Sequence, residues 1–382
     1  MKKNRYEIIQ IIILKFLKPL VHIWMLFDMK RVVHKTDSVD FKRKEPYIML
    51  ANHVFIFDVI HVPLKFKKNP YIVASENLFV KQPTKFLFKW VVHVIPKSKG
   101  ASDLRTAKGI ISAKKKGFPI LIFPEGDATF YGQTREIEYS TIKLIKKLGI
   151  DLIVCNVKGG FLSRPRWATG KRKRRQVDLF YDVVIKKEEL KTLSISEISE
   201  IVTKALFNND YDFQREHMIK HPGKDLAMGM ENVVYVCPEC EAINSIKTSG
   251  NQIKCNSCNT EGIMNQYGFI EGFKFDNLFD WDTYQRGFYD KIYNTRIESS
   301  GRLHYLSFED STKEYQGEVN IVSENGVLSL SGVVNEDIKI EDIKNPIITL
   351  RRNLSFTYNS KRYFIQLEQF GSSLLRVMQD KY

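Results

Sequence analysis

Two short polar motifs constrain this chain most, because each follows a run of apolar residues that favours a β-strand. The first, residues 52–58, reads Asn-His-Val-Phe-Ile-Phe-Asp and follows the run 47–50. The second, residues 123–126, reads Phe-Pro-Glu-Gly and follows the run 120–122. Each motif is therefore expected where a strand ends and a turn begins. The intervening and following segments alternate between strand-like and helix-like patterns, which predicts an α/β fold with both motifs at one edge of its sheet.

The spacing of His53 and Asp58 suggests chemistry for the first motif. Residues five apart on a regular helix diverge by roughly 140°, so a continuous helix would hold these side chains apart. If His53 lies on the turn and Asp58 opens the next helix, the carboxylate can reach back to the ring. It would then fix the tautomer and leave the other ring nitrogen as a general base. The alternative is that Asp58 only caps the helix that it starts.

The nucleophile that this base would serve is an incoming hydroxyl. Serine, threonine and cysteine are all absent beside His53, so no covalent intermediate on the protein is suggested. We therefore expect the hydroxyl to attack an activated acyl group directly.

Together the two motifs resemble those of the glycerolipid acyltransferase family, which includes the lysophosphatidic acid acyltransferases. That family is marked by Asn-His-x4-Asp followed further along by Phe-Pro-Glu-Gly, and both occur here in that order. The resemblance implies that His53 is the base on the acceptor hydroxyl and Asp58 its partner. It also implies that Asn52, Glu125 and Gly126 line the substrate pocket. The implied reaction transfers a fatty acyl group from acyl-CoA or acyl carrier protein to a lysolipid, as in phospholipid biosynthesis.

The resemblance covers roughly residues 30–210, and two positions within it depart from the family. Lys97 stands where the family usually offers an arginine to the acceptor phosphate, and lysine cannot make the bidentate fork of arginine. After Gly126 the family commonly continues Thr-Arg-Ser, whereas residues 127–129 here read Asp-Ala-Thr. The best acceptor is 1-acyl-sn-glycerol-3-phosphate, with another lysolipid or a glycolipid as the alternative.

Residues 1–29 are expected to form an amphipathic helix at the membrane interface. The apolar run is long enough to span a bilayer, but Lys15, Lys18 and Pro19 fall near its middle, where charge is costly. At helical spacing the polar residues gather on one side, which is typical of a helix lying in the interface plane. The alternatives are a spanning helix and a helix packed on the protein's own core.

Basic residues are concentrated in the first 230 residues, although the whole chain carries a net charge of +15. The densest run, residues 164–175, is expected to bind anionic lipids, an acidic acyl carrier protein or the phosphates of coenzyme A. Trp167 within it is a candidate anchor at the head-group level. A solvated loop is one alternative. The rival interpretation is a zinc-ribbon protein that binds nucleic acid, since basic runs also contact the phosphates of nucleic acid. We favour binding of lipid or of the acyl donor over binding of nucleic acid.

Four cysteines form a second strong pattern. Cys237 and Cys240 are separated by two residues, as are Cys255 and Cys258, and fourteen residues lie between the pairs. This spacing predicts a structural zinc ion held by four thiolates in a zinc ribbon, with disulfides as the alternative. Thiolates kept for zinc imply a reducing compartment. The expected location is therefore the cytoplasmic face of the cell membrane.

The predicted organisation has four parts. The interfacial helix (1–29) precedes an acyltransferase domain (30–220), a zinc ribbon (232–262) and a β-rich region (265–382). We interpret the β-rich region as a small antiparallel barrel or sandwich that resembles a PH-like or GRAM-like module, or else as a structural domain without a ligand. Further expected elements are helices over 83–94, 137–148, 194–207 and 279–293, a helix capped at Ser102-Asp103, and a hairpin turning at Asn359-Ser360.

Overall fold

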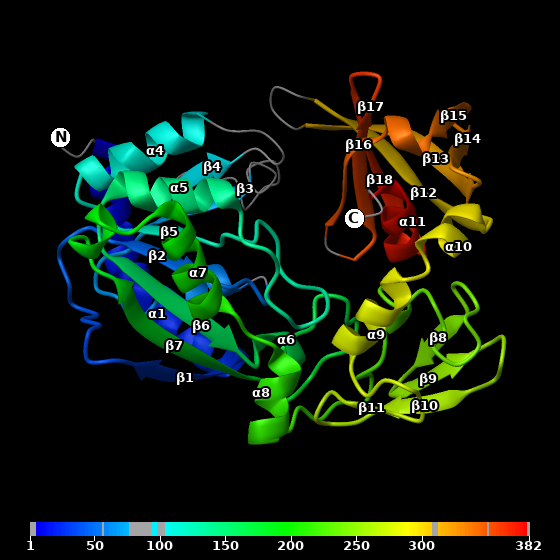
Figure 1. Cartoon of the computed structure of the whole chain (residues 1–382), viewed down its shortest axis with the longest axis horizontal. Coiled ribbons are helices and arrows are strands. Elements are labelled where there is room, and N and C mark those ends of the chain that lie inside the picture. Colours follow the sequence, from blue (N-terminus) through cyan, green and yellow to red (C-terminus); the bar gives the residue numbers. More distant parts are fainter. Residues whose placement is uncertain are drawn as a thin grey trace. The chain divides into compact units, whose positions relative to one another are not determined.

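The computed structural model describes most of the chain, which divides into two compact units (Figure 1). Unit 1 comprises residues 1–165 and 174–219, and unit 2 comprises residues 166–173 and 220–382. The helix expected over 83–94, apart from its last two residues, and the cap at Ser102-Asp103 lie outside the described residues. The described residues are 5–55, 57–75, 93–97, 104–307, 312–349 and 351–379.

Unit 1 is built on a seven-stranded sheet in the order β1-β7-β6-β2-β5-β3-β4. Strands β6 and β7 pair antiparallel, and the other neighbours pair parallel. This confirms the α/β prediction. The strands are β1 (Lys30–Lys35), β2 (Ile48–Ala51), β3 (Tyr71–Ser75), β4 (Val94–Lys97), β5 (Ile120–Ile122), β6 (Leu152–Lys158) and β7 (Gln176–Ile185). The helices are α1 (Arg5–Asp28), α2 (Asp58–His61), α4 (Leu104–Lys115), α5 (Tyr139–Leu148), α6 (Gly160–Ser163), α7 (Ile195–Leu206) and α8 (Asp210–His217).

The centre of the sheet is apolar on both faces, as expected for parallel strands covered by other elements. All four residues of β2 are buried. Helices α4, α5 and α7 pack their apolar sides on one face, against β2, β5 and β6. Two of these helices have the ends that the sequence predicts. A capping box at Ser194 starts α7, and Gly149 ends α5 in the left-handed conformation. Because β2 and β5 are neighbours, the two motifs lie side by side.

Helix α1 turns its polar side toward the protein. Glu7 is buried, accepts a hydrogen bond of 2.7 Å from the Tyr71 hydroxyl and pairs with Lys116. The Lys18 ammonium donates to the Asn69 side chain at 3.0 Å and to a backbone carbonyl. These polar contacts tie both halves of the helix to unit 1.

The opposite, apolar side of α1 is exposed. Phe16 is 74% exposed and Phe27 is 85% exposed, and isoleucines, leucines and Trp24 continue the same surface. By length and composition, residues 7–28 with a mean hydropathy of 1.7 would suffice to cross a membrane. A crossing helix would have to give up the polar contacts with unit 1, each costly to lose in lipid. Because the polar side of α1 is bonded to the protein and its apolar side is exposed, the structure favours a helix that lies in the plane of the membrane interface.

We therefore expect the double substitution Phe16→Ser and Phe27→Ser to weaken binding to vesicles. Two phenylalanines that insert into lipid should contribute enough that binding falls by at least roughly tenfold. Flotation with neutral phosphatidylcholine vesicles measures this, and the melting temperature should stay unchanged because both rings are exposed. Tyr315→Ser, at a 55% exposed aromatic residue of unit 2, is the matched control. Unchanged flotation together with a lower melting temperature would show that the face packs on protein instead.

Unit 2 contains two antiparallel sheets. The small sheet has the order β11-β10-β9-β8 and carries Cys255 at the end of β9, and the large sheet has the order β15-β14-β13-β12-β18-β17-β16. The small sheet consists of β8 (Ile246–Ser249), β9 (Gln252–Cys255), β10 (Glu261–Met264) and β11 (Ile270–Glu271). The large sheet consists of β12 (Ile297–Leu306), β13 (Lys313–Glu324), β14 (Val327–Gly332), β15 (Glu336–Lys339), β16 (Lys344–Thr349), β17 (Asn353–Tyr358) and β18 (Lys361–Leu367).

The β-rich region agrees with the expected antiparallel architecture, with differences in detail. The hairpin at Asn359-Ser360 is confirmed, and both residues have positive φ angles as a type I′ turn requires. The single helix expected over 279–293 is instead two, α9 (Leu278–Arg286) and α10 (Tyr289–Asn294). A further helix, α11 (Gly371–Met378), follows the last strand. The PH-like or GRAM-like interpretation stays a prediction.

Residues 166–173 belong to unit 2, although the sequence placed them in the acyltransferase domain. The backbone N–H groups of Thr169 and Lys173 donate to the carbonyls of Met228 and Pro222 at 2.9 and 2.8 Å. At Gly170 a Cβ atom would lie only 1.9 Å from a backbone carbonyl, so this close approach requires glycine.

The side chains of this segment correct one expectation. Trp167 is 1% exposed, and the Arg172 guanidinium lies over its ring at 5.5 Å and donates to the Leu226 carbonyl. A buried indole cannot reach the head groups, so the prediction of Trp167 as a membrane anchor is wrong. Lys171, Lys173 and Arg174 of the same run are exposed, so the run keeps basic side chains open to an anionic partner.

Candidate functional site

The histidine and aspartate of the first motif meet at the carboxyl end of β2. His53 lies on the turn, and Asp58 is the first residue of α2. The Asp58 Oδ2 atom lies 2.9 Å from His53 Nδ1 and also accepts the backbone N–H groups of Val54 and Phe55 at 2.7 and 3.0 Å. Asp58 is fully buried, whereas the His53 side chain keeps 19% exposure. The pair therefore presents an oriented imidazole with solvent access.

The same carboxylate shapes the turn. By accepting two backbone N–H groups and the imidazole, it ties residues 53–55 to the start of α2. The expected reach of Asp58 back to His53 across the start of the helix is thus present. Burial raises the pKa of Asp58, while the bonds from His53 and the two backbone N–H groups oppose that rise.

Glu125 of the second motif joins the two motifs rather than facing an open pocket. Its Oε1 accepts the His53 backbone N–H and its Oε2 accepts the Arg135 backbone N–H, both at 2.6 Å. It is 7% exposed. Burial raises the pKa of Glu125 to about 7 against the opposing effect of these two N–H donors. The geometry therefore favours a positioning role over direct contact with a substrate.

Asn52 ties the first motif to the neighbouring strand. Its side-chain amide donates to the Val157 carbonyl at 2.8 Å and accepts the Val157 N–H at 2.6 Å. Asn52 is fully buried. Because its amide oxygen and nitrogen are both engaged by β6, the residue fixes where β2 ends, next to His53.

Lys97 and Gly126 also approach each other, through a residue that the sequence did not indicate. Lys97, the last residue of β4, pairs with Glu138, whose backbone N–H donates to the Pro124 carbonyl at 3.0 Å. A Cβ at Gly126 would lie 3.0 Å from Glu138, and Gly126 has a φ of 73° that favours glycine. Lys97, the lysine expected to meet an acceptor phosphate, is thus already paired with a carboxylate. No local pattern could have identified it, because the contact spans 41 residues.

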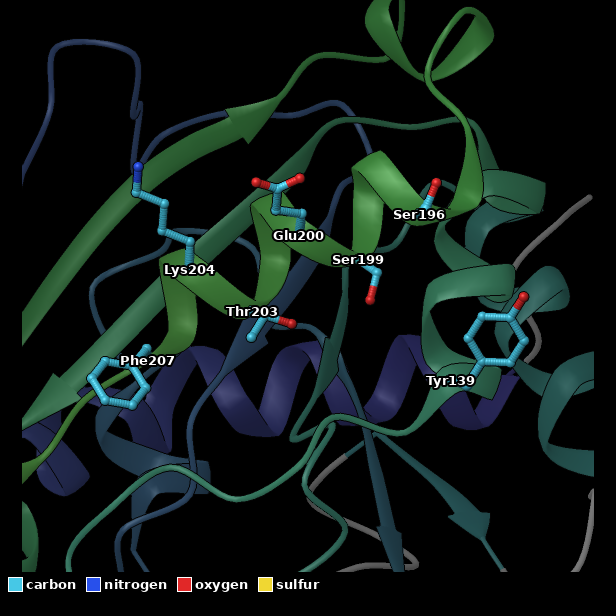
Figure 2. Close-up of a pocket in the computed structure, with 7 residues that line it drawn as sticks. All are labelled: Tyr139, Ser196, Ser199, Glu200, Thr203, Lys204 and Phe207. Atoms are coloured by element: carbon cyan, nitrogen blue, oxygen red, sulfur yellow. The ribbon is translucent and has the colours of Figure 1, made fainter.

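A hollow elsewhere on unit 1 has a volume of about 740 Å³ and lies over α7 and the start of α5 (Figure 2). Its lining mixes hydroxyl, charged and aromatic side chains, and contains none of the motif residues. The lining residues are Tyr139, Ser196, Ser199, Glu200, Thr203, Lys204 and Phe207.

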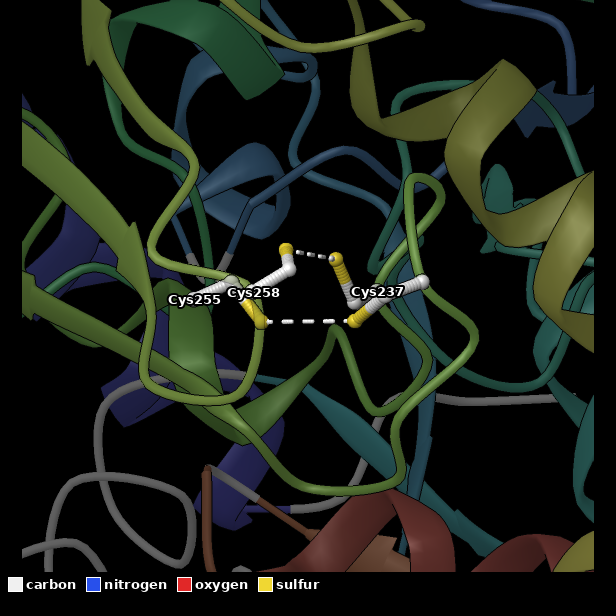
Figure 3. Close-up of side chains that lie close together, drawn as sticks. Cys237, Cys255 and Cys258 are labelled. Carbon is white, nitrogen blue, oxygen red and sulfur yellow. Dashed lines mark hydrogen bonds between the residues drawn. The ribbon is translucent and has the colours of Figure 1, made fainter.

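The four cysteine sulfurs of unit 2 gather in one place (Figure 3). All lie within 4.8 Å of one another, with 3.9 Å between Cys237 and Cys258 and 3.8 Å between Cys240 and Cys255. A tetrahedral zinc ion with Zn–S bonds of 2.3 Å would need sulfurs about 3.8 Å apart. A disulfide would need about 2.05 Å. The spacing therefore fits a four-thiolate metal site and not disulfides.

The two cysteine turns have the same backbone form. The N–H of Glu241 donates to the Cys237 carbonyl and that of Asn259 to the Cys255 carbonyl, each at 2.9 Å. Glu241 and Asn259 both have positive φ angles, 59° and 60°. Hydroxyls stand beside two of the sulfurs, Ser245 at 3.2 Å from Cys255 and Thr260 at 3.2 Å from Cys258. Such outer groups orient metal-binding thiolates.

The bridging role of Glu125 generates a prediction for stability. Glu125→Gln keeps one acceptor oxygen but places an amide NH₂ group against the other backbone N–H, so the free energy of unfolding should fall by about 1–3 kcal/mol. Denaturant unfolding measures this loss, and Glu136→Gln at a nearby exposed glutamate is the matched control.

The raised pKa of Glu125 predicts that the stability of the protein depends on pH. A carboxyl whose pKa is higher in the folded protein is stabilising below its unfolded pKa, and this contribution is lost as the pH rises through about 7. The wild-type protein should therefore lose stability relative to Glu125→Gln between pH 5 and 8. A difference between the two proteins that does not change with pH would contradict this assignment.

One comparison with known proteins covers the part of the sequence that holds both motifs. A family model described as acyltransferase matches residues 32–158, a range that contains both motifs. One similar solved structure is the crystal structure of the 1-acyl-sn-glycerophosphate (LPA) acyltransferase PlsC from Thermotoga maritima. It shares 18% sequence identity and a TM-score of 0.42, over 58% of this chain and 86% of that chain. No curated protein matches. The match to the acyltransferase family model thus covers about a third of the chain, and it includes both motifs.

Proposed function

We propose that this protein transfers a fatty acyl group from a thioester, acyl-CoA or acyl carrier protein, to the hydroxyl of a lysophospholipid. The observation that carries the proposal is the bond between His53 and the buried Asp58, at the strand end that Glu125 of the second motif also holds. The family match supports the reaction class. The preferred acceptor is 1-acyl-sn-glycerol-3-phosphate, and the product would then be phosphatidic acid.

The geometry of His53 suits a general base. Its Nδ1–H donates to Asp58, which leaves Nε2 unprotonated and able to take the proton of the acceptor hydroxyl. The oxygen then attacks the thioester carbonyl, an oxygen ester forms, and the carbon–sulfur bond breaks. The thiolate leaves with the proton that His53 returns. Asp58 keeps the ring oriented and stabilises its positive charge during the transfer.

A membrane surface is the proposed site of action. The exposed apolar face of α1 would lie in the interface, where lysolipids are presented, and the helix would bind as a peripheral or monotopic element. The four cysteines of unit 2, grouped as thiolate ligands for zinc, support a reducing compartment and hence the cytoplasmic face of the membrane. Anionic lipids are the partners that the basic character of residues 1–230 favours.

His53→Ala should abolish acyl transfer while the fold and vesicle binding stay intact. Loss of a positioned general base typically lowers the rate by roughly 10²–10⁴-fold. Initial rates with a long-chain acyl-CoA and 1-acyl-sn-glycerol-3-phosphate in mixed micelles measure this. Asp58→Asn should also lose activity because the ring loses its anionic partner. Full activity of the His53→Ala protein would end the acyltransferase proposal.

We propose further that the four cysteines hold one structural zinc ion. Its tetrahedral site would be closed by four thiolates, with no position open for a substrate. Bound zinc would supply folding free energy to the small sheet, because structural zinc is normally part of what stabilises such ribbons. The metal is thus assigned to structure and not to the transfer step.

Cys255→Ser should therefore lose the metal and loosen residues 232–262. Metal analysis of the purified wild-type chain should give about one zinc per chain, and amide hydrogen exchange should show reduced protection of this region in the variant. Cys155→Ala is the control, because that buried cysteine lies in unit 1, and the variant should keep its zinc. Purified wild-type protein without metal, with its cysteines reduced, would refute the assignment.

A further inference from the structure

Three segments of unit 1 bring charged side chains together at the carboxyl end of α1. Asp28, the last residue of α1, accepts a two-pronged interaction from Arg164, with Nη2 at 2.9 Å and Nη1 at 3.3 Å. Arg175, which precedes β7, also pairs with Asp28 at 3.1 Å. These three side chains are partly buried, and the two arginine side chains keep 29% and 23% of their surface exposed to solvent.

A third arginine in this region has unused donors. Arg31 on β1 points one nitrogen at the His22 ring, 3.2 Å away. Its Nε and Nη1 atoms are buried without a hydrogen-bond partner among the described residues. Both ring nitrogens of His61 are also buried and unpartnered there, and His61 lies within electrostatic range of Asp28, Arg31 and Arg164. Buried donors without partners are costly, so this cluster is incomplete as it stands.

Positive charge is in excess in this cluster. Among the described residues, Asp28 is the one carboxylate that the structure bonds to Arg164 and Arg175, and Arg31 is bonded to none. Burial lowers the pKa of Arg31, and burial together with Arg175 lowers the pKa of Arg164 against the opposing charge of Asp28. An arrangement that holds cations together with too few anions gains stability when an anion joins it.

The cluster adjoins both the membrane-facing helix and the catalytic turn. The Arg164 guanidinium lies 4.8 Å from the centre of the Phe57 ring, and Phe57 directly precedes Asp58. The Trp24 ring, on the exposed side of α1, packs edge-on against Phe57 at 5.8 Å. An anion bound by these arginines would therefore sit beside the first motif and next to the surface that we place in the interface.

We propose that Arg31, Arg164 and Arg175 form a phosphate-binding site that takes the phosphate group of the lysolipid acceptor. Guanidinium groups match phosphate oxygens with paired hydrogen bonds, which the lysine at position 97 cannot offer. Lys97 is, moreover, already paired with Glu138. The inference rests on the proposed acyl transfer and specifies which acceptors the site selects: lysolipids that carry a phosphate over those that lack it.

The test compares two acceptors that differ in the phosphate, 1-acyl-sn-glycerol-3-phosphate and 1-acylglycerol, in neutral detergent micelles with the full chain. Arg164→Gln and Arg175→Gln should each raise the KM for the phosphate-bearing acceptor by about 10-fold or more, because a hydrogen bond to a charged group is lost. The KM for 1-acylglycerol and for the acyl donor should not change. Arg164→Lys, which keeps the charge, should lie between wild type and Arg164→Gln.

Two variants separate recognition from folding. Asp28→Asn removes the internal competitor for the arginines and should lower the KM for the phosphate-bearing acceptor. Arg43→Gln is the matched charge control, since Arg43 pairs with Asp151 at the opposite end of the sheet and should leave both acceptors unaffected. Equal losses on both acceptors in the Arg164 and Arg175 variants would overturn the proposal.

A binding measurement distinguishes failure of this site from failure of the reaction. The full-length His53→Ala protein should bind lysophosphatidic acid in calorimetric titrations, and adding Arg164→Gln should abolish that binding even if no acyl transfer is ever observed. Inorganic phosphate should compete only weakly, because it lacks the acyl chain. If the arginine variants lose flotation on vesicles with phosphatidylglycerol yet keep wild-type KM values, the site binds bulk lipid and the acceptor assignment is wrong.

Discussion

The carboxylate of Asp58 is the interaction on which the site depends. One buried oxygen accepts the His53 ring and two backbone N–H groups, so the same atom orients the imidazole and sets the path of the turn. Bonds from charged or preorganised donors are stronger in a water-poor site than at a surface. A carboxylate enclosed in this way holds the ring at the strand end before any acceptor arrives, which is what a general base requires.

The surrounding sheet keeps that turn in place through two further bridges. Asn52 pairs with the backbone of Val157 on β6, and Glu125 after β5 accepts the backbone N–H of His53. The turn after β2 is therefore held from both neighbouring strands. This explains why an asparagine precedes the histidine and why a glutamate follows Phe-Pro: each offers acceptors of the right length to backbone groups that the sheet leaves unpaired.

The sequence predicted those parts of the fold that have a local cause. Apolar runs identified β2, β5 and β6, and Ser194 and Gly149 correctly predicted the ends of α7 and α5. The edge strand β1, with the sequence Lys-Arg-Val-Val-His-Lys, has no such pattern and was missed. Within the site, the spacing of His53 and Asp58 in the sequence predicted the contact between their side chains. The partners of Glu125 could not be predicted from the sequence, because these bonds join residues 53, 125 and 135. The burial of Trp167 could not be predicted either, because it depends on residues far away in the sequence.

The segment 166–173 shows that unit 1 is not one continuous stretch of chain. Its middle is packed within unit 2, where Trp167 is buried and Arg172 is hydrogen-bonded. Unit 1 borders the segment at Pro165 and Arg174, and the adjoining Arg164 and Arg175 hold Asp28. A fragment ending at residue 219 would keep the segment but lose the parts of unit 2 on which it packs. The large apolar indole of Trp167 would then be exposed. Arg164 and Arg175 each lie two residues outside the segment, so loosening it would act on the arginines that hold Asp28 through the chain itself.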